Sequence, residues 1–174
     1  AELAGDDGRP VRLVANLPYN ITSPLVAELI GSAWKSAAGG SGAGLPIDRL
    51  VFTVQREVAD RLDADAGTKD YGPLSVVCQG LGEVSVLIGK ISPNAFYPKP
   101  NVHSALVRID LPAATLRQVS DLAILRRWLD VGFGHRRKSL SASIKLLDSE
   151  WRARLTTAAL AVGIDLQRRG ETLT

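Results

Sequence analysis

Four consecutive residues near the start of the chain, Asn16, Leu17, Pro18 and Tyr19, carry groups suited to chemistry on an adenine amine. That amine is a poor nucleophile because its lone pair is delocalised into the ring. An asparagine oxygen and a neighbouring carbonyl of Leu17 or Pro18 can accept both amine hydrogens and direct the lone pair at a methyl donor. Tyr19 would stack on the flipped base. The same four residues are equally compatible with a strand-ending turn closed by a packed tyrosine.

The residues on either side predict how this motif is positioned. Residues 11–15 are apolar and β-branched, which predicts a buried strand that leads directly into Asn16. Ser23 and Pro24 then predict the N-cap and first turn of a helix that continues to about Trp34. The motif is therefore expected at a strand-to-helix connection, the edge of an open α/β sheet where ligands bind.

The rest of the chain predicts a second strand, two further helices and a pair of β-like runs before the pattern becomes wholly helical. We expect a strand over 50–54, helices over 56–62 and 73–81, and β-like runs over 84–88 and 104–109 that form an antiparallel hairpin or a sheet edge. Beyond Pro112 the helical patterns lie near 122–129, near 144–147 and over 151–162, the last ended by Gly163. These patterns predict an α/β domain over residues 1–115 and an all-helical domain over residues 116–174.

Composition narrows the class of protein. Hydrophobic residues make up 45% of the 174 positions, no run is long enough to span a bilayer, and the first residues do not form an export signal, so we expect a cytoplasmic protein without membrane contact. Cys78, the single cysteine, is predicted to be buried. His103 and His135 have no carboxylate or cysteine at ligand spacing, so no metal site is expected. The glycines of segment 36–46 fit no phosphate-binding pattern and predict a linker.

Positive charge is concentrated at the C-terminal end. Residues 1–120 carry 11 Lys and Arg against 12 Asp and Glu, whereas residues 121–174 carry 10 against 6. A basic surplus of this kind suits a polyanion such as nucleic acid, because each neutralised phosphate releases counterions. Candidate phosphate contacts are Arg136, Arg137 and Lys138, with Arg168 and Arg169 as further candidates; a solvated helix face is the alternative explanation.

Five motifs occur in one order along the chain. They are VANLPYNITSP (14–24), VQREVADRL (54–62), YGPLSV (71–76), FYPKPNVHS (96–104) and FGHRRKSL (133–140). Together they resemble the bacterial small-subunit rRNA adenine N6-dimethyltransferases, the kasugamycin-sensitivity methyltransferases, over nearly the whole chain. The erythromycin-resistance methyltransferases, which act on large-subunit rRNA, share the superfamily. Leu17 and the second and third motifs look more like the small-subunit branch.

The resemblance implies a class I, Rossmann-like methyltransferase sheet followed by a small helical domain that contacts rRNA. It implies transfer of two methyl groups from S-adenosyl-L-methionine to each of two adjacent adenines near the 3′ end of small-subunit rRNA. Asn16 matches the catalytic asparagine, and Asn16, Leu17 and Pro18 border the cofactor. Tyr19 and Phe96 match the aromatics on the two faces of the target base. Without the resemblance, Phe96 could equally anchor its loop in the core.

One part of the family pattern has no match here. No Glu-x-Gly-x-Gly-like loop for the cofactor's methionine part occurs, and only about ten residues precede the first predicted strand. We therefore expect a fragment, inactive alone, that comprises the C-terminal part of the methyltransferase sheet and an incomplete helical domain. A sheet without its other strands exposes apolar faces and edges, so self-association is also expected. The alternatives are a large-subunit rRNA methyltransferase and a noncatalytic RNA-binding or ribosome-assembly module.

Overall fold

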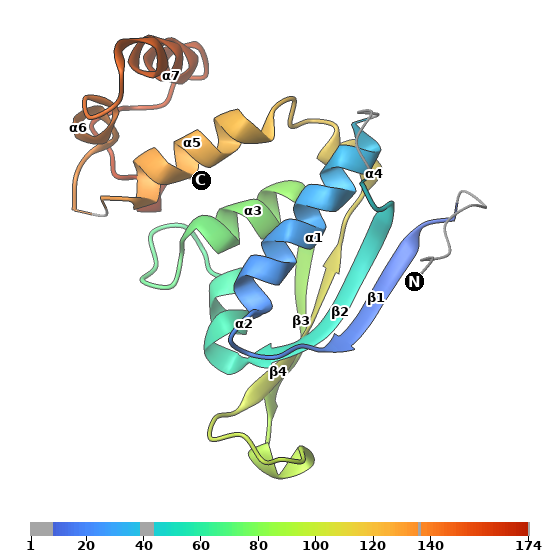
Figure 1. Cartoon of the computed structure of the whole chain (residues 1–174). Helices are drawn as coiled ribbons and strands as arrows, with labels where there is room; N and C mark the ends of the chain where they lie inside the picture. Colours follow the sequence, from blue (N-terminus) through green and yellow to red (C-terminus); the bar gives the residue numbers. More distant parts are fainter. Residues whose placement is uncertain (1–8, 39–43, 136, 174) are drawn as a thin grey trace. The chain divides into compact units, whose positions relative to one another are not determined.

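A computed structural model describes residues 9–38, 44–135 and 137–173. It divides into two compact units (Figure 1). The first unit comprises Ala1–Ala64 and Leu74–Ser120, and the second comprises Asp65–Pro73 and Asp121–Thr174. No helix within the described ranges is both long and apolar enough to cross a bilayer.

The first unit is built on a four-stranded sheet in the order β1-β2-β4-β3. Strand β1 (Val11–Asn16) is parallel to β2 (Ile47–Gln55), and β4 (Ser104–Asp110) is antiparallel to both β2 and β3 (Glu83–Ile91). The predicted α/β class and the predicted antiparallel pairing of residues 84–88 with 104–109 are confirmed. The parallel pair forms across a helical crossover, as parallel pairing requires.

Helices cover one face of this sheet. Helix α1 (Thr22–Ala37) and helix α3 (Pro73–Leu81) lie in front of the same face in Figure 1, and α2 (Arg56–Leu62) packs against β2, β3 and β4. The core between helices and sheet is fully buried; its largest members are Val26, Ile30, Leu50, Phe52, Val54, Leu62, Leu81, Val107 and Ile109. Helix α1 begins at Thr22 with Ile21 at the N-cap, whereas the sequence predicted Ser23 as the N-cap. The earlier start follows from the Thr22 hydroxyl, which donates to the Pro18 carbonyl in the preceding turn.

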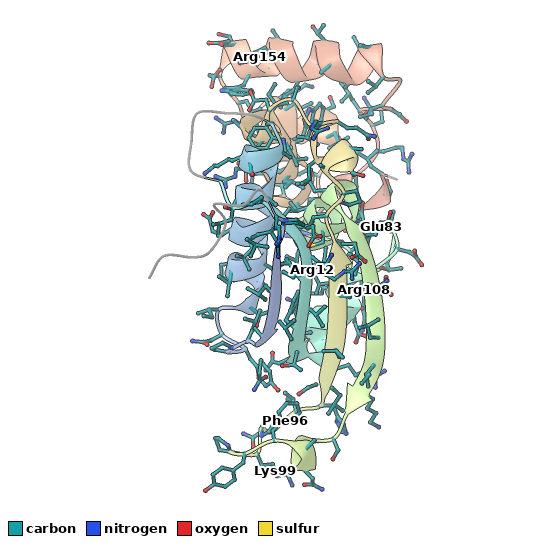
Figure 2. The ribbon with its side chains drawn as sticks, turned by 90° about the vertical axis from the view of Figure 1, so that its right-hand side faces the viewer. Arg12, Glu83, Phe96, Lys99, Arg108 and Arg154 are labelled. Atoms are coloured by element: carbon teal, nitrogen blue, oxygen red, sulfur yellow. The ribbon has the colours of Figure 1, made fainter. Side chains whose placement is uncertain are left out.

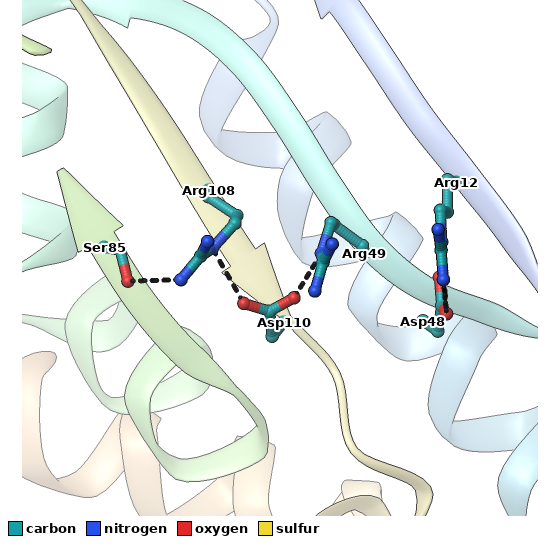
Figure 3. Close-up of polar contacts among 6 residues, drawn as sticks. All are labelled: Arg12, Asp48, Arg49, Ser85, Arg108 and Asp110. Carbon is teal, nitrogen blue, oxygen red and sulfur yellow. Dashed lines mark hydrogen bonds and ion pairs between the residues drawn. The ribbon is translucent and has the colours of Figure 1, made fainter. Parts of the chain in front are cut away.

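The opposite face of the sheet carries alternating polar and apolar side chains. Strand β1 forms as predicted, but the prediction that it is buried is wrong. Val14 is 81% exposed, and β1 pairs only with β2 among the described residues. Figure 3 shows a row of ion pairs across this face. The half-buried Asp110 carboxylate lies between Arg49 (2.5 Å) and Arg108 (2.8 Å). The Asp110 carboxylate is therefore shared by two guanidinium groups, while Arg12 pairs separately with Asp48.

The second unit is helical, as predicted for the C-terminal part of the chain. It contains α5 (Leu122–Phe133), α6 (Leu140–Ile144), α7 (Ser149–Ala161) and the 3-10 turn η2 (Gly170–Thr172). Side chains of Asp121, Ser139 and Asp148 accept hydrogen bonds from the first free amides of α5, α6 and α7. Val131, Leu140, Ile144 and Leu155 form its buried core.

The division between the units lies further along the chain than the boundary expected at residues 115/116. Helix α4 (Ala113–Leu116) and the residues after it stay with the sheet, because Leu116 is buried and Trp34 Nε1 donates to the Val119 carbonyl at 2.6 Å. Residues 65–73 belong to the helical unit instead. The Gly67 amide donates to the Glu171 carbonyl at 2.7 Å, and the Tyr71 and Phe133 rings lie 6.0 Å apart.

The helical unit depends on a close approach of Gly170 to Gly132. A Cβ at Gly170 would lie 2.4 Å from the Gly132 Cα, whereas a Cβ at Gly132 would meet only ordinary contacts. We therefore expect Gly170→Ala to lower the free energy of unfolding by about 1–3 kcal/mol, as overpacking does. Gly132→Ala, the matched control in helix α5, should be neutral or stabilising by up to about 1 kcal/mol. Urea unfolding of both variants tests this, and equal destabilisation would contradict it.

Burial of Cys78 generates a second prediction. The side chain is fully buried, as predicted from sequence, and burial raises the pKa of its thiol to about 12. The native thiol should therefore resist alkylation at pH 8 and react only after unfolding. The pKa of the thiol in the folded protein lies above its ordinary value of about 8.5 in the unfolded chain. The free energy of unfolding is therefore unaffected by this thiol below about pH 8.5 and declines as the pH rises from there towards 12. Unfolding measured by iodoacetamide labelling between pH 7 and 10 checks both points.

Candidate active site at the end of the sheet

Asn16 ends strand β1 on the exposed face of the sheet. Its register partner on β2 is Thr53, whose hydroxyl donates to the Asn16 side-chain oxygen. Because both residues are held by the parallel ladder, this bond fixes the direction of the amide group. An amide oxygen has two acceptor positions. One is therefore taken by Thr53, and one remains for a ligand.

The turn after Asn16 is closed through the carbonyl oxygen of Pro18. This oxygen accepts from the Ile21 amide at 3.2 Å and from the Thr22 hydroxyl at 3.0 Å. Leu17 is buried under the turn, whereas Pro18 is exposed. Both acceptor positions of the Pro18 carbonyl are thus used within the chain. Of the two carbonyls considered from sequence, that of Leu17 is the better placed to meet a ligand.

Tyr19 is anchored across the sheet to the start of β4. Its hydroxyl lies 2.5 Å from the hydroxyl of Ser104, which is completely buried. A buried hydroxyl without a partner is costly, so this bond fixes the far end of the tyrosine ring. Tyr19 itself remains half-buried and lines a cavity. Sequence reasoning identified Tyr19 but not Ser104, which is 85 positions away and carries no signal of its own.

Phe96 reaches the same place from the turn between β3 and β4. The turn begins with a 3-10 segment, η1 (Pro93–Ala95), and Phe96 follows in extended conformation and half-buried. Figure 2 shows Phe96 and Lys99 beyond the end of the strands. The predicted site residues Asn16, Leu17, Pro18, Tyr19 and Phe96 all line one open cavity of about 500 Å³, together with Tyr97, Pro98 and Pro100.

The residues that line this cavity are uncharged: one asparagine, the aromatic residues Tyr19, Phe96 and Tyr97, three prolines and a leucine. Such a lining suits a flat heteroaromatic ring, which apolar faces can hold while amide and carbonyl oxygens accept its N–H groups. The same oxygens suit the positive sulfonium end of a methyl donor. None of the lining residues is acidic, so the cavity has no carboxylate to bind the ribose hydroxyls or the ammonium group of the methyl donor. The lining therefore fits the methyl-bearing end of S-adenosylmethionine only.

Four of the basic residues predicted to contact RNA, Arg137, Lys138, Arg168 and Arg169, lie in the helical unit. The fifth, Arg136, lies outside the described residues. Arg137 and Lys138 are exposed just before α6. The Leu140 amide donates to the Arg168 carbonyl at 2.9 Å, so the two basic segments are neighbours. Arg168 is less available than the sequence suggests, because its guanidinium bonds to Thr172. Arg169 lies 3.9 Å from Glu171.

Two further arginines were not identified from sequence. The guanidinium groups of Arg127 and Arg154 lie 5.0 Å and 4.5 Å from the centre of the Trp151 ring. Stacking on an indole holds a guanidinium in place and leaves its N–H donors at the surface. Arg127 and Trp151 come from different helices, so their spacing in sequence gave no indication of the cluster.

The neutral cavity at the carboxyl end of β1, with its asparagine and aromatic residues, agrees with the family match. The family described as "Ribosomal RNA adenine dimethylase" matches residues 3–173. The chain belongs to this family. Two relatives are named "Ribosomal RNA small subunit methyltransferase A". The one from Anaeromyxobacter sp. (strain K) is 40% identical, and the match covers all of this chain and 57% of the relative. The one from Rhodospirillum rubrum is 42% identical, and the match covers 94% of this chain and 51% of the relative. The chain thus spans about half the length of the curated relatives it matches.

Solved structures support the fold assignment. A dimethyladenosine transferase from Plasmodium falciparum superposes with a TM-score of 0.71 at 20% identity, over 93% of this chain and 62% of that one. The 23S rRNA methyltransferase ErmE superposes with a TM-score of 0.57 at 23% identity, over 95% of this chain and 61% of that one. Their likeness shows the Rossmann-like methyltransferase fold expected from sequence.

The bond between Tyr19 and Ser104 generates a prediction that separates anchoring from stacking. Tyr19→Phe keeps the ring but leaves the Ser104 hydroxyl buried without its partner, so we expect a loss of about 1–3 kcal/mol in the free energy of unfolding. The double variant Tyr19→Phe/Ser104→Ala should recover most of this loss, since no polar group is then stranded. Chemical denaturation of the wild type, both single variants and the double variant measures the coupling. Additive losses would contradict the anchoring role.

Proposed function

We propose that the protein containing this chain transfers methyl groups from S-adenosylmethionine to N6 of two adjacent adenines near the 3′ end of small-subunit rRNA. The observation that carries the proposal is the neutral cavity in which the Asn16 oxygen, oriented by Thr53, lies near the rings of Tyr19 and Phe96. The names of the relatives that match this chain favour small-subunit over large-subunit rRNA.

The residues of the chain account for the positioning half of this reaction. S-adenosylmethionine supplies an electrophilic methyl group on sulfur when it is bound. Tyr19 and Phe96 hold the flipped adenine between their rings. The Asn16 oxygen and the Leu17 carbonyl accept the two amine hydrogens, which turns the nitrogen lone pair away from the ring system. As the new N–C bond forms, these oxygens stabilise the positive charge on nitrogen until a proton leaves to solvent.

A neutral asparagine suits this task better than a carboxylate. The amine needs orientation and a dipole, and the nitrogen loses its proton readily once it carries a methyl group and a positive charge. A strong base is therefore unnecessary. For the RNA partner, exposed Arg137 and Lys138 are proposed to contact phosphate, which would position the RNA without reading its sequence.

Removal of the Asn16 amide tests the proposal. We expect Asn16→Ala, in the protein encoded by the complete gene, to lower the rate of methyl transfer by about 100-fold or more, as loss of a transition-state dipole does elsewhere. Thr53→Val should cause a smaller loss, because the amide remains but is no longer oriented. Gln118→Ala removes an exposed amide far along the chain from the site and serves as the matched control. Labelled methyl transfer to immature small subunits, with the products located by mass spectrometry, gives the rates.

The outcomes distinguish the proposal from its alternatives. Labelled methyl groups in large-subunit rRNA would favour the alternative of a large-subunit rRNA methyltransferase. Binding of rRNA without any transfer by the wild-type protein would favour a noncatalytic assembly module. Full activity of Asn16→Ala would remove the chemical role assigned to this residue.

A further inference from the structure

The turn between β3 and β4 presents a second aromatic side chain immediately after Phe96. Phe96 is half-buried at the cavity, whereas Tyr97 is fully exposed. The extended backbone at Phe96 (φ −122°, ψ 150°) directs successive side chains to opposite sides. Both residues nevertheless contribute to the cavity wall. Tyr97 therefore stands at the mouth of the cavity rather than inside it.

The backbone that carries Tyr97 is constrained. The Ala95 amide donates to the Ser92 carbonyl at 3.0 Å, and the Phe96 amide donates to the Pro93 carbonyl at 3.2 Å. Pro98 follows directly and fixes its own φ. Because the backbone before the ring is already ordered, stacking of a ligand costs mainly the rotamer freedom of the tyrosine side chain. Isolated exposed aromatics are ordinary on protein surfaces, so the inference depends on this constraint together with the position at the cavity mouth.

The charge of the same segment favours an anionic ligand. Residues 84–109 contain no Asp or Glu, and they carry Lys90, Lys99 and Arg108. Arg108 is paired with Asp110, but Lys90 and Lys99 are exposed. Lys99 lies two residues beyond Tyr97, on the part of the turn that Figure 2 shows beyond the strands. An aromatic face with a cation close by is the arrangement that binds a nucleotide in single-stranded nucleic acid.

We propose that Tyr97 and Lys99 form an outer platform for the unpaired RNA nucleotide next to the target adenine. This inference rests on the proposed function, since it requires a base inside the cavity. When one nucleotide flips into the cavity, its neighbour is left unstacked at the mouth. Tyr97 replaces the lost stacking partner of that neighbour, and Lys99 contacts its phosphate. The platform holds the second of two adjacent adenines close to the site while the first is modified.

The test is the binding of a short single-stranded oligoribonucleotide that contains two adjacent adenines to the 174-residue chain. One RNA is intact, and two others have an abasic residue on the 5′ or the 3′ side of one adenine. We expect one abasic RNA to bind the wild type about 5- to 100-fold more weakly than the intact RNA, the range for loss of one stacked base. Tyr97→Ala should bind the intact RNA with the same loss and discriminate little between intact and abasic RNA.

Variants of the same turn serve as controls. Tyr97→Phe retains the ring and should bind like the wild type. Val102→Ala removes another exposed apolar side chain of the turn and should also bind like the wild type. Lys99→Ala should weaken the binding of all three RNAs by the same factor. It should also reduce the salt dependence of the binding constant, as expected for loss of a phosphate contact. Thermal unfolding of each variant should match the wild type, because the altered side chains are exposed.

The possible results separate this inference from the proposed function. If Tyr97→Ala weakens binding of intact and abasic RNA equally, or not at all, the platform is overturned while methyl transfer is unaffected. Failure of the wild-type chain to bind any of the RNAs also overturns it. Asn16→Ala should slow methyl transfer in the complete protein, as given above, yet preserve the discrimination against the abasic RNA in the 174-residue chain. Absence of methyl transfer by the complete wild-type protein, with the discrimination against abasic RNA retained, would count against the proposed function and leave the platform standing.

Discussion

The Pro18 carbonyl, which accepts from the Ile21 amide and the Thr22 hydroxyl, is the point on which the site depends. These bonds turn the chain from strand β1 into helix α1 within a few residues. The turn leaves Asn16 at the end of the ladder opposite Thr53 and directs Tyr19 towards β4. Proline suits this position because its fixed φ lowers the entropy lost on forming the turn. A looser turn would separate the amide from the tyrosine ring.

The antiparallel strand β4 supplies the other half of the site. Its pairing with β2 places Ser104 opposite Gln55, two residues beyond the Thr53 that pairs with Asn16 at the end of β1. Ser104 can then anchor Tyr19, and the preceding turn brings Phe96 to the cavity. Residues about 80 positions apart meet only through this strand order. The mixed topology thus has a chemical consequence, because a target base needs aromatic faces from two separate segments.

Local features were predictable from sequence, whereas contacts between distant segments were not. The strand before Asn16, helices α2, α3, α5 and α7 and the β3–β4 pair follow from apolar periodicity and from proline and glycine positions. The bonds of Thr53 to Asn16 and of Ser104 to Tyr19 do not, because threonine and serine are common strand residues and only the register gives them a role. The exposed face of β1 was missed because an apolar run is typical of a strand covered on both faces.

The separation of neutral and charged residues follows from the two tasks that the proposed function requires. The cavity is lined by amide, carbonyl and aromatic groups, whereas the basic surplus lies in residues 121–174. A cation inside the cavity would oppose the positive charge that develops on the methylated nitrogen, and a carboxylate there would have to be desolvated as the base enters. Phosphate binding needs the opposite, exposed cations that can release counterions. A neutral site for the base, together with basic residues elsewhere in the chain, meets both requirements. Lys99 is the cation that the proposed platform places beside the cavity.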